Sequence, residues 1–326
     1  MRLLIIHPGG IGDVLLALPA IRSLRYRHHA DEIGLLAAGQ VGRLLRDCHE
    51  VDTVFSLESG ALTDLLSVGS PRASLFSSWL EGCDLVQCWM ADRDGYLAAK
   101  LSGQGRRRSN VCSANTLSSN SRHQSDRYLE AAQCSGFEQE EAPLAFPQDM
   151  ELVGRAALSK AGVSINQPYA VIHPGSGSVH KCCDPALCES IVRWLIQRRL
   201  APLIVHGPAD EGQINRIQAV LRQPFHLLEH CDLSTLAWII KGAALYVGHD
   251  SGITHLAAAL GVPTVACFGP TDEARWAPRG QRVLIMRGAA CHCVDWDAVQ
   301  QCRDKPCLKI SSASLIQKCE AILEGN

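Results

Sequence analysis

The chain has little net charge and no long apolar segment. Its 326 residues hold 31 Lys and Arg against 33 Asp and Glu, a formal net charge of −2. That balance excludes a strong overall positive potential of the kind that attracts nucleic acid or an anionic membrane. No nucleic-acid partner is therefore expected. The first apolar run ends at Ile6, and no apolar stretch reaches the roughly 18–20 residues of a membrane span. We therefore expect a cytoplasmic protein without a signal peptide.

Cysteine, by contrast, is abundant, with 15 residues scattered along the chain. In a reducing compartment, an odd and scattered set indicates thiols rather than a disulfide framework. Four of them gather near the C-terminus: Cys291, Cys293, Cys302 and Cys307. Their C-x-C-x8-C-x4-C spacing lacks the paired C-x2-C knuckles that are usual in zinc sites. We expect thiols here and no metal, with a bound metal as the alternative.

Short apolar runs alternate with segments of helical periodicity. Strands are expected at 2–6 and 32–38 with a helix at 14–26 between them, and the alternation restarts at 169–178. Apolar strands separated by helices indicate parallel sheets covered on both faces. The pattern fades over 103–125.

These repeats predict an α/β protein with two Rossmann-like domains. Each half opens with a strand that ends in His-Pro-Gly, and a charged, proline-containing linker separates the halves. The expected domains are 1–148 and 149–310, followed by a terminal helix within 311–326. Ligands of such folds bind beyond the carboxyl ends of the strands, so we expect the site in a cleft between the two sheets.

The first glycine-rich turn, HPGGIGD, precedes a helix. Gly10 and Gly12 fit the start of a dinucleotide fingerprint, but Leu15 stands at the third glycine position. What remains is a tight turn that places Asp13 at the helix start. Asp13 is either a helix cap, which alone explains an Asp there, or a general base.

The second turn, HPGSGSVHK, joins another strand to a helix. Its polar and flexible residues are Ser176, Gly177, Ser178 and Lys181. Backbone N–H groups in such a turn can face an anion, and Lys181 adds a point charge, so the turn indicates a phosphate site. A Gly/Ser turn with a solvated lysine is the alternative. After the next strand, Asp210 and Glu211 are either helix caps or acceptors for sugar hydroxyls.

The third junction, VGHDSGITH, is the most polar. Asp250 or Ser251 can cap the following helix, Gly252 allows a ligand close to the backbone, and His255 can share their face of the first turn. Capping explains one of these polar residues and leaves the others for a ligand.

The segments GGIGDVLLALPAIRSL, HPGSGSVHK, GPADE and VGHDSGITHLAAALGVPTVACFGPTD, in this order and spacing, resemble glycosyltransferase family 9. These are the ADP-heptose–lipopolysaccharide heptosyltransferases. The resemblance implies GT-B architecture, in which two Rossmann-like domains with parallel sheets face each other across a cleft. It also implies that the N-terminal domain binds the acceptor, the C-terminal domain binds the nucleotide-sugar, and the last helix packs on the N-terminal domain.

The resemblance further implies inverting, metal-independent transfer of heptose from ADP-heptose to a lipopolysaccharide inner-core acceptor, with no cofactor. Asp13 matches the base, and Glu211 matches a carboxylate that contacts the nucleoside. The positions that match the donor's diphosphate and sugar are Ser176, Gly177, Ser178, Lys181, Asp250, Ser251, Gly252 and His255. The residues expected to bind the acceptor are Gly10, Arg106, Arg122 and Arg127, with a solvated basic loop as the alternative.

One departure from the family concerns the residues after Lys181. Members often carry Trp-Pro there, whereas Cys183 and Asp184 precede Pro185 in this chain. The change leaves the donor sugar open. Other functions also remain open: a GT-B sugar-nucleotide 2-epimerase, a transferase for another nucleotide-sugar, or a non-catalytic nucleotide-sugar binding protein. A lipopolysaccharide acceptor would place the protein in the cytoplasm or at the inner face of the inner membrane. The sequence indicates no oligomeric state.

Overall fold

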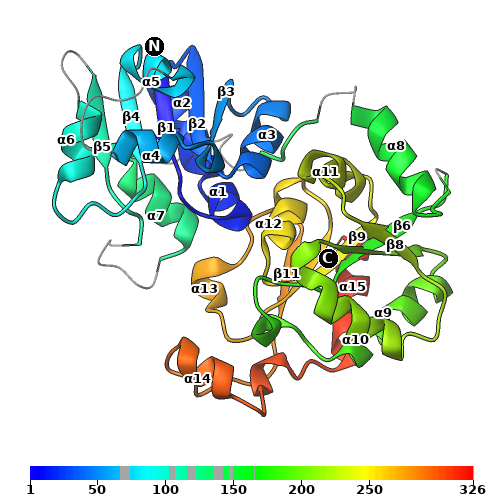
Figure 1. Ribbon diagram of the computed structural model, residues 1–326. Helices are drawn as coiled ribbons and strands as arrows, with labels where there is room; N and C mark the ends of the chain where they lie inside the picture. Colours follow the sequence, from blue (N-terminus) through cyan, green and yellow to red (C-terminus); the bar gives the residue numbers. More distant parts are fainter. Residues whose placement is uncertain are drawn as a thin grey trace. The chain divides into compact units, whose positions relative to one another are not determined.

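The computed structural model describes residues 1–66, 74–102, 107–115, 122–134, 142–146, 150–164 and 166–325. Contacts divide the chain into two compact units, Met1–Pro147 and Gln148–Asn326 (Figure 1). This division lies one residue from the expected boundary. Across the described ranges, every helix is too short or too polar to cross a membrane.

The first unit is built on a parallel sheet of five strands in the order β3-β2-β1-β4-β5. The strands are β1 (Arg2–Ile6), β2 (Glu32–Ala37), β3 (Thr53–Ser56), β4 (Leu85–Cys88) and β5 (Arg108–Val111). The described helices are α1 (Ile11–Leu16), α2 (Leu18–His28), α3 (Gly39–Asp47), α4 (Ala61–Leu66), α5 (Leu75–Glu81), α6 (Tyr96–Ser102) and α7 (Gln124–Ala131), with a 3-10 turn η1 (Leu57–Ser59). Strands β1 and β2 are buried almost throughout, as a sheet covered on both faces requires.

Two local predictions for this unit need correction. The helix expected at 14–26 is divided into α1 and α2 at Ala17, and Pro19 lies in the first turn of α2. Proline has no N–H to donate, so it suits a new helix start better than a helix interior. The fading pattern after 103 hid strand β5, which pairs with β4 at the sheet edge. Its four residues include Arg108, Ser109 and Asn110, so it lacks the apolar signal of a buried strand.

The second unit is built on a parallel sheet of six strands in the order β11-β10-β9-β6-β7-β8. The strands are β6 (Tyr169–His173), β7 (Ala201–His206), β8 (His226–Glu229), β9 (Leu245–His249), β10 (Thr264–Cys267) and β11 (Val283–Met286). The helices are α8 (Met150–Lys160), α9 (Pro185–Gln197), α10 (Glu211–Val220), α11 (Leu233–Lys241), α12 (Gly252–Ala259), α13 (Glu273–Trp276), α14 (Trp296–Gln301) and α15 (Ser312–Glu324). Three 3-10 turns complete it: η2 (Val179–Lys181), η3 (Pro208–Asp210) and η4 (Pro306–Leu308). The two parallel sheets confirm the predicted α/β fold class.

The terminal helix α15 lies within the predicted range 311–326 and packs in the core of the second unit. Its Leu315, Cys319 and Ile322 are buried in the core of the second unit, with residues of α9, β10 and β11. Its apolar stripe therefore covers part of the second sheet. The packing of this helix on the N-terminal domain, which the family resemblance implies, stays a prediction.

Candidate functional site

The strand order of the second sheet reverses between β6 and β9. From β6 the chain proceeds outward through β7 and β8, and from β9 it proceeds outward on the other side through β10 and β11. At such a switch point the loops beyond the carboxyl ends diverge and leave a crevice for a ligand. The polar turns at 174–181 and 250–255 follow these two strands. The topology therefore brings together two segments that are about 75 positions apart in the sequence.

Lys181 and Ser176 both contact Asp250 across this switch point. Lys181 Nζ lies 2.7 Å from Asp250 Oδ2, and the Ser176 hydroxyl donates to the Asp250 carbonyl at 2.6 Å. The Asp250 side chain is 8% exposed and that of Lys181 is 23% exposed. The expected phosphate-binding cation is thus held at the crevice by a carboxylate from the neighbouring strand.

Ser251 caps helix α12, whose first residue is Gly252. Its Oγ accepts from the Thr254 N–H, and the Thr254 hydroxyl in turn donates to the His249 carbonyl. A helix start presents unpaired N–H groups and the positive end of the helix dipole, which favours an anion. The cap interpretation is therefore correct for Ser251, and it is compatible with a bound diphosphate.

A Ser-His-Asp chain of hydrogen bonds orients the same serine. His173 Nδ1 lies 3.2 Å from Ser251 Oγ, and His173 Nε2 lies 3.2 Å from Asp210 Oδ2. A proton on Nε2 would be donated to the Asp210 carboxylate, and Nδ1 would then accept from the Ser251 hydroxyl. Burial acts to raise the pKa of Asp210, but its hydrogen bonds with His173 and the Gly207 N–H, together with positive charge from the neighbouring histidines, hold that pKa below its ordinary 3.8. Gly175 leaves room for this carboxylate, because a Cβ there would overlap Asp210.

The sequence pointed to Glu211, whereas its neighbour Asp210 makes these contacts. Glu211 is exposed at the start of α10. Asp210 is 7% exposed and also accepts from the Gly207 N–H at 2.9 Å. His173 was also not identified from the sequence as a residue of this site. The His-Pro-Gly motif that contains it was the signal that could have pointed to it. The nucleoside contact expected for Glu211 stays a prediction.

The remaining predicted donor residues are placed as follows. Ser178 caps η2 by accepting from the His180 N–H at 3.3 Å. At Gly177, a Cβ would meet nothing within 4 Å among the described residues, so this backbone is open. His255 is 7% exposed within α12, one turn beyond Ser251.

An aromatic residue does stand beside Lys181, but it comes from another segment. The Trp296 ring at the start of α14 has its centroid 5.9 Å from Lys181 Nζ, and the side chain is 41% exposed. The residues that follow Lys181, where the family resemblance leads us to expect Trp-Pro, line a pocket beside the end of β6. Its wall includes Cys183, Asp184 and Pro185.

In the first unit, the Asp13 carboxylate helps to cap the start of helix α1. The Gly10 N–H donates to Asp13 Oδ2 at 3.1 Å, and Gly10 is the N-cap of α1. A Cβ at Gly9 would overlap both Asp13 and the His7 ring, so glycine permits this close turn. His7 is 1% exposed, and burial lowers its pKa to about 3. The cap is established by these contacts, and the role of Asp13 as a base stays a prediction.

The basic residues expected to bind the acceptor differ in their exposure. Arg127 is fully buried, and its Nε donates to the Ala114 carbonyl at 2.8 Å. The guanidinium lies inside the fold, so the structure does not support the contact with the acceptor that was expected for Arg127. Arg122 is 59% exposed and pairs with Glu130 at 3.1 Å. Arg106 lies outside the described residues.

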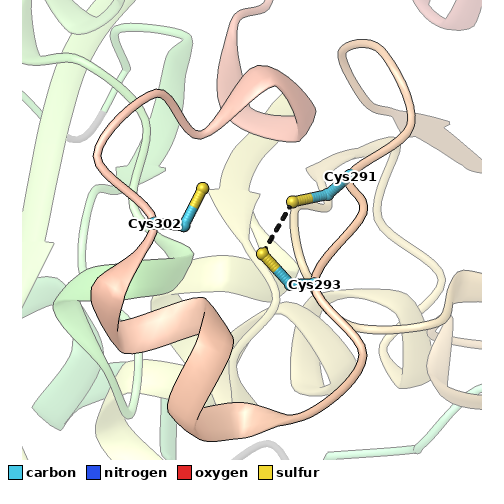
Figure 2. A group of neighbouring side chains, drawn as sticks. All are labelled: Cys291, Cys293 and Cys302. Atoms are coloured by element: carbon cyan, nitrogen blue, oxygen red, sulfur yellow. Dashed lines mark hydrogen bonds between the residues drawn. The ribbon is translucent and has the colours of Figure 1, made fainter.

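Three of the four C-terminal cysteines converge, which their spacing did not lead us to expect. The sulfur atoms of Cys291, Cys293 and Cys302 all lie within 4.8 Å of one another (Figure 2). Cys307 is buried close by and hydrogen-bonds with Cys291. This arrangement can hold a metal ion.

Comparison with known proteins agrees with this geometry. The family model described as glycosyltransferase family 9 (heptosyltransferase) matches residues 103–306. Lipopolysaccharide heptosyltransferase 3 of Escherichia coli is 32% identical over 134 residues, which are 40% of this chain and 39% of that relative. The matched region thus spans about two fifths of that relative's length.

Two solved structures share the fold over the whole chain. The family 9 glycosyltransferase of Veillonella parvula DSM 2008 has a TM-score of 0.78 at 16% identity, covering 100% of this chain and 98% of that one. The E. coli ADP-heptose lipopolysaccharide heptosyltransferase II has a TM-score of 0.76 at 18% identity, covering 100% and 99%. These likenesses confirm the predicted GT-B fold.

Proposed function

Because the chain belongs to glycosyltransferase family 9, we propose that it is an enzyme that transfers heptose from ADP-heptose to a lipopolysaccharide inner-core acceptor. The observation that carries the proposal is the arrangement of Lys181, Ser251 and Gly252 at one switch point. A lysine and a helix start there offer a diphosphate both a cation and unpaired N–H groups. Relatives named as lipopolysaccharide heptosyltransferases supply the donor and acceptor class.

In this proposal the second unit binds the donor. The diphosphate lies over Gly177 and the start of α12, with Lys181 beside it. Negative charge grows on ADP as the bond to the anomeric carbon breaks, and Lys181 with the backbone N–H groups stabilises that charge. Asp250 and His255 are assigned to the sugar, and Glu211 to the nucleoside.

The first unit supplies the acceptor side and the base. Asp13 accepts the proton of the acceptor hydroxyl while that oxygen attacks the anomeric carbon and ADP leaves, which inverts the configuration there. No metal is assigned to this step. Gly10, at the same turn, and the exposed Arg122 remain the described candidates for contact with the acceptor. The acceptor also places the protein in the cytoplasm or at the inner face of the inner membrane.

The direct test is transfer by the purified full-length protein. It is incubated with ADP-heptose and heptose-deficient core oligosaccharide, and the products are analysed by mass spectrometry and by ADP release. We expect the acceptor to gain the mass of one heptose. Asp13→Asn is expected to abolish transfer while ADP binding, measured by calorimetry, is retained.

Asp92→Asn is the matched control, because Asp92 also accepts backbone N–H groups from the first turn of a helix, α6, in the same unit. It should leave transfer unchanged. Undiminished turnover by Asp13→Asn would remove Asp13 as the base. Conversion of a UDP-sugar without any acceptor would support the epimerase alternative, and donor binding without turnover under any condition would support a binding protein.

A further inference from the structure

We propose that Cys291, Cys293, Cys302 and Cys307 form a tetrathiolate site for one transition-metal ion, Zn²⁺ or Fe²⁺. The site closes the segment between β11 and α15 and is structural rather than catalytic. It lies in the second unit and does not depend on the proposed function.

The distances suit tetrahedral thiolate coordination. Zinc–sulfur bonds of about 2.3 Å set sulfur atoms roughly 3.8 Å apart around a tetrahedral ion. In the structure, the sulfur atoms of Cys291, Cys293 and Cys302 all lie within 4.8 Å of one another. Figure 2 shows them pointing toward a common point, with Cys302 at the end of α14 and the other two from the preceding loop. Soft thiolates in a tetrahedral set select zinc or iron over harder cations.

Cys307 supplies the fourth ligand, because a backbone hydrogen bond from Gly288 holds the end of the 288–307 segment next to its beginning. Its side chain is buried and hydrogen-bonds with Cys291. The Gly288 N–H donates to the Cys307 carbonyl at 2.8 Å. A Cβ at Gly288 would overlap the Pro306 carbonyl, so glycine allows this close approach. Cys307 is thereby held beside Cys291, where its sulfur can complete the set of three as a fourth ligand.

The backbone around Cys302 has the character of a metal-binding turn. The Lys305 N–H donates to Cys302 Sγ at 3.4 Å, as N–H groups around a metal site do toward metal-bound thiolates. To present that N–H, Lys305 adopts the left-handed region with φ of 43°. A residue other than glycine rarely does so unless the surroundings hold it there. A coordinated Cys302 would provide that constraint.

The segment between Gly288 and Ile310 buries few apolar side chains, so a bound metal ion would supply the stability that its packing does not. Between Gly288 and Ile310, most side chains are exposed or half-buried, and Val294 is 91% exposed. The same segment carries Trp296 beside Lys181. A metal that bridges its two ends would replace the missing core and hold this ring in place.

A disulfide is the competing arrangement. Cys291 Sγ and Cys293 Sγ are 3.0 Å apart, well beyond the ~2.05 Å of a covalent bond. A bond between them would also remove two of the three converging thiolates. The two possibilities differ in metal content and in thiol reactivity, so one set of measurements separates them.

The test begins with metal analysis of the full-length protein purified without chelator from cells supplied with zinc and iron. We expect about one zinc or iron ion per chain, and the analysis identifies which. Cys302→Ser and Cys307→Ser should each lose most of the metal and lower the thermal midpoint. Cys231→Ser is the matched control, because Cys231 is a half-buried cysteine of the same unit outside the cluster. It should retain the metal.

A second measurement does not depend on whether the variants fold. Metal-stripped wild-type protein is titrated with Co²⁺, whose visible absorption distinguishes tetrahedral thiolate ligation from other geometries. An intense tetrathiolate spectrum that saturates at one equivalent and is displaced by Zn²⁺ supports the site. Metal-free protein that gives no such spectrum, or a Cys291–Cys293 disulfide found by peptide mass spectrometry in protein purified under reducing conditions, would overturn it.

Discussion

Lys181 Nζ and Asp250 Oδ2 form a 2.7 Å ion pair between two segments that follow neighbouring parallel strands. The pair neutralises the cation that the proposed donor would use. A diphosphate that enters this crevice must therefore compete with Asp250 for Lys181, or share it. Neither charge is fully solvated, so each should influence anion binding more than an exposed residue would.

Opposite effects are expected from the two members of this pair. Lys181→Met should weaken ADP binding by about tenfold or more, because a charge-assisted contact contributes about 1.5–3 kcal/mol. Asp250→Asn should leave ADP binding equal or tighter, because a competing negative charge is removed. Calorimetric titration with ADP measures both. Lys309→Met, at an exposed lysine paired with Asp304, is the control and should bind as wild type does. Equal losses in both pair variants would contradict the competition.

Ser251 can be tested as a cap and as a ligand contact separately. It and Ser311 are both helix N-caps that accept an N–H from three residues later. Replacing either by Ala should lower the unfolding free energy by about 1 kcal/mol. Only Ser251→Ala should also weaken binding of ADP-heptose. If both variants bind the donor as wild type does, Ser251 is a cap and nothing more.

Two glycines of the same turn offer a contrast in packing. Gly175→Ala should destabilise the second unit by about 1–3 kcal/mol, because the new methyl group overlaps Asp210 and disrupts its bond with His173. Gly177→Ala should change stability by less than about 0.5 kcal/mol, because its Cβ would point into open space within the described structure. Chemical denaturation compares the two. A similar loss in both would show that the Asp210 contact is not the cause.

Acid should destabilise the first unit through His7. Its pKa is lowered by burial from 6.5 to about 3, so the unfolded chain takes up a proton at a higher pH than the folded chain does. Stability is therefore complete above pH 6.5 and is lost progressively as the pH falls toward 3. Between pH 7 and pH 5 the expected loss is about 2 kcal/mol.

His7→Gln should flatten the stability profile of this unit over that interval, because glutamine does not titrate. Urea denaturation at several pH values checks this. Above pH 7 the wild-type and variant profiles should run parallel, which serves as the internal control. Parallel profiles below pH 6 as well would mean that His7 takes up its proton in the folded state.

The local elements were largely readable from the sequence. The strands β1 and β6 and the helix α15 follow from apolar runs and helical spacing, which act over a few residues. The edge strand β5 was missed because its pattern is polar, and α1 and α2 were merged because Pro19 suits a helix start as well as a kink. Those errors come from signals that are weak over short windows.

The functional side chains divide in the same way. The turns that carry Asp13, Lys181 and Ser251 were located by glycine and hydroxyl residues at strand ends, because the geometry of a tight turn demands those residue types. Adjacent residues such as Asp210 and Glu211 could not be told apart, since a single residue step decides whether a carboxylate points toward His173 or into solvent.

The sequence by itself therefore determined the alternation of elements, the position of the polar turns and the family resemblance, all of which depend on local pattern. Tertiary structure alone decided which turns meet. It placed Asp250 against Lys181 by making β6 and β9 neighbours, it buried Arg127, and it brought Cys302 to Cys291 and Cys293. These contacts depend on strand order and on the packing of distant segments, and no local pattern encodes either.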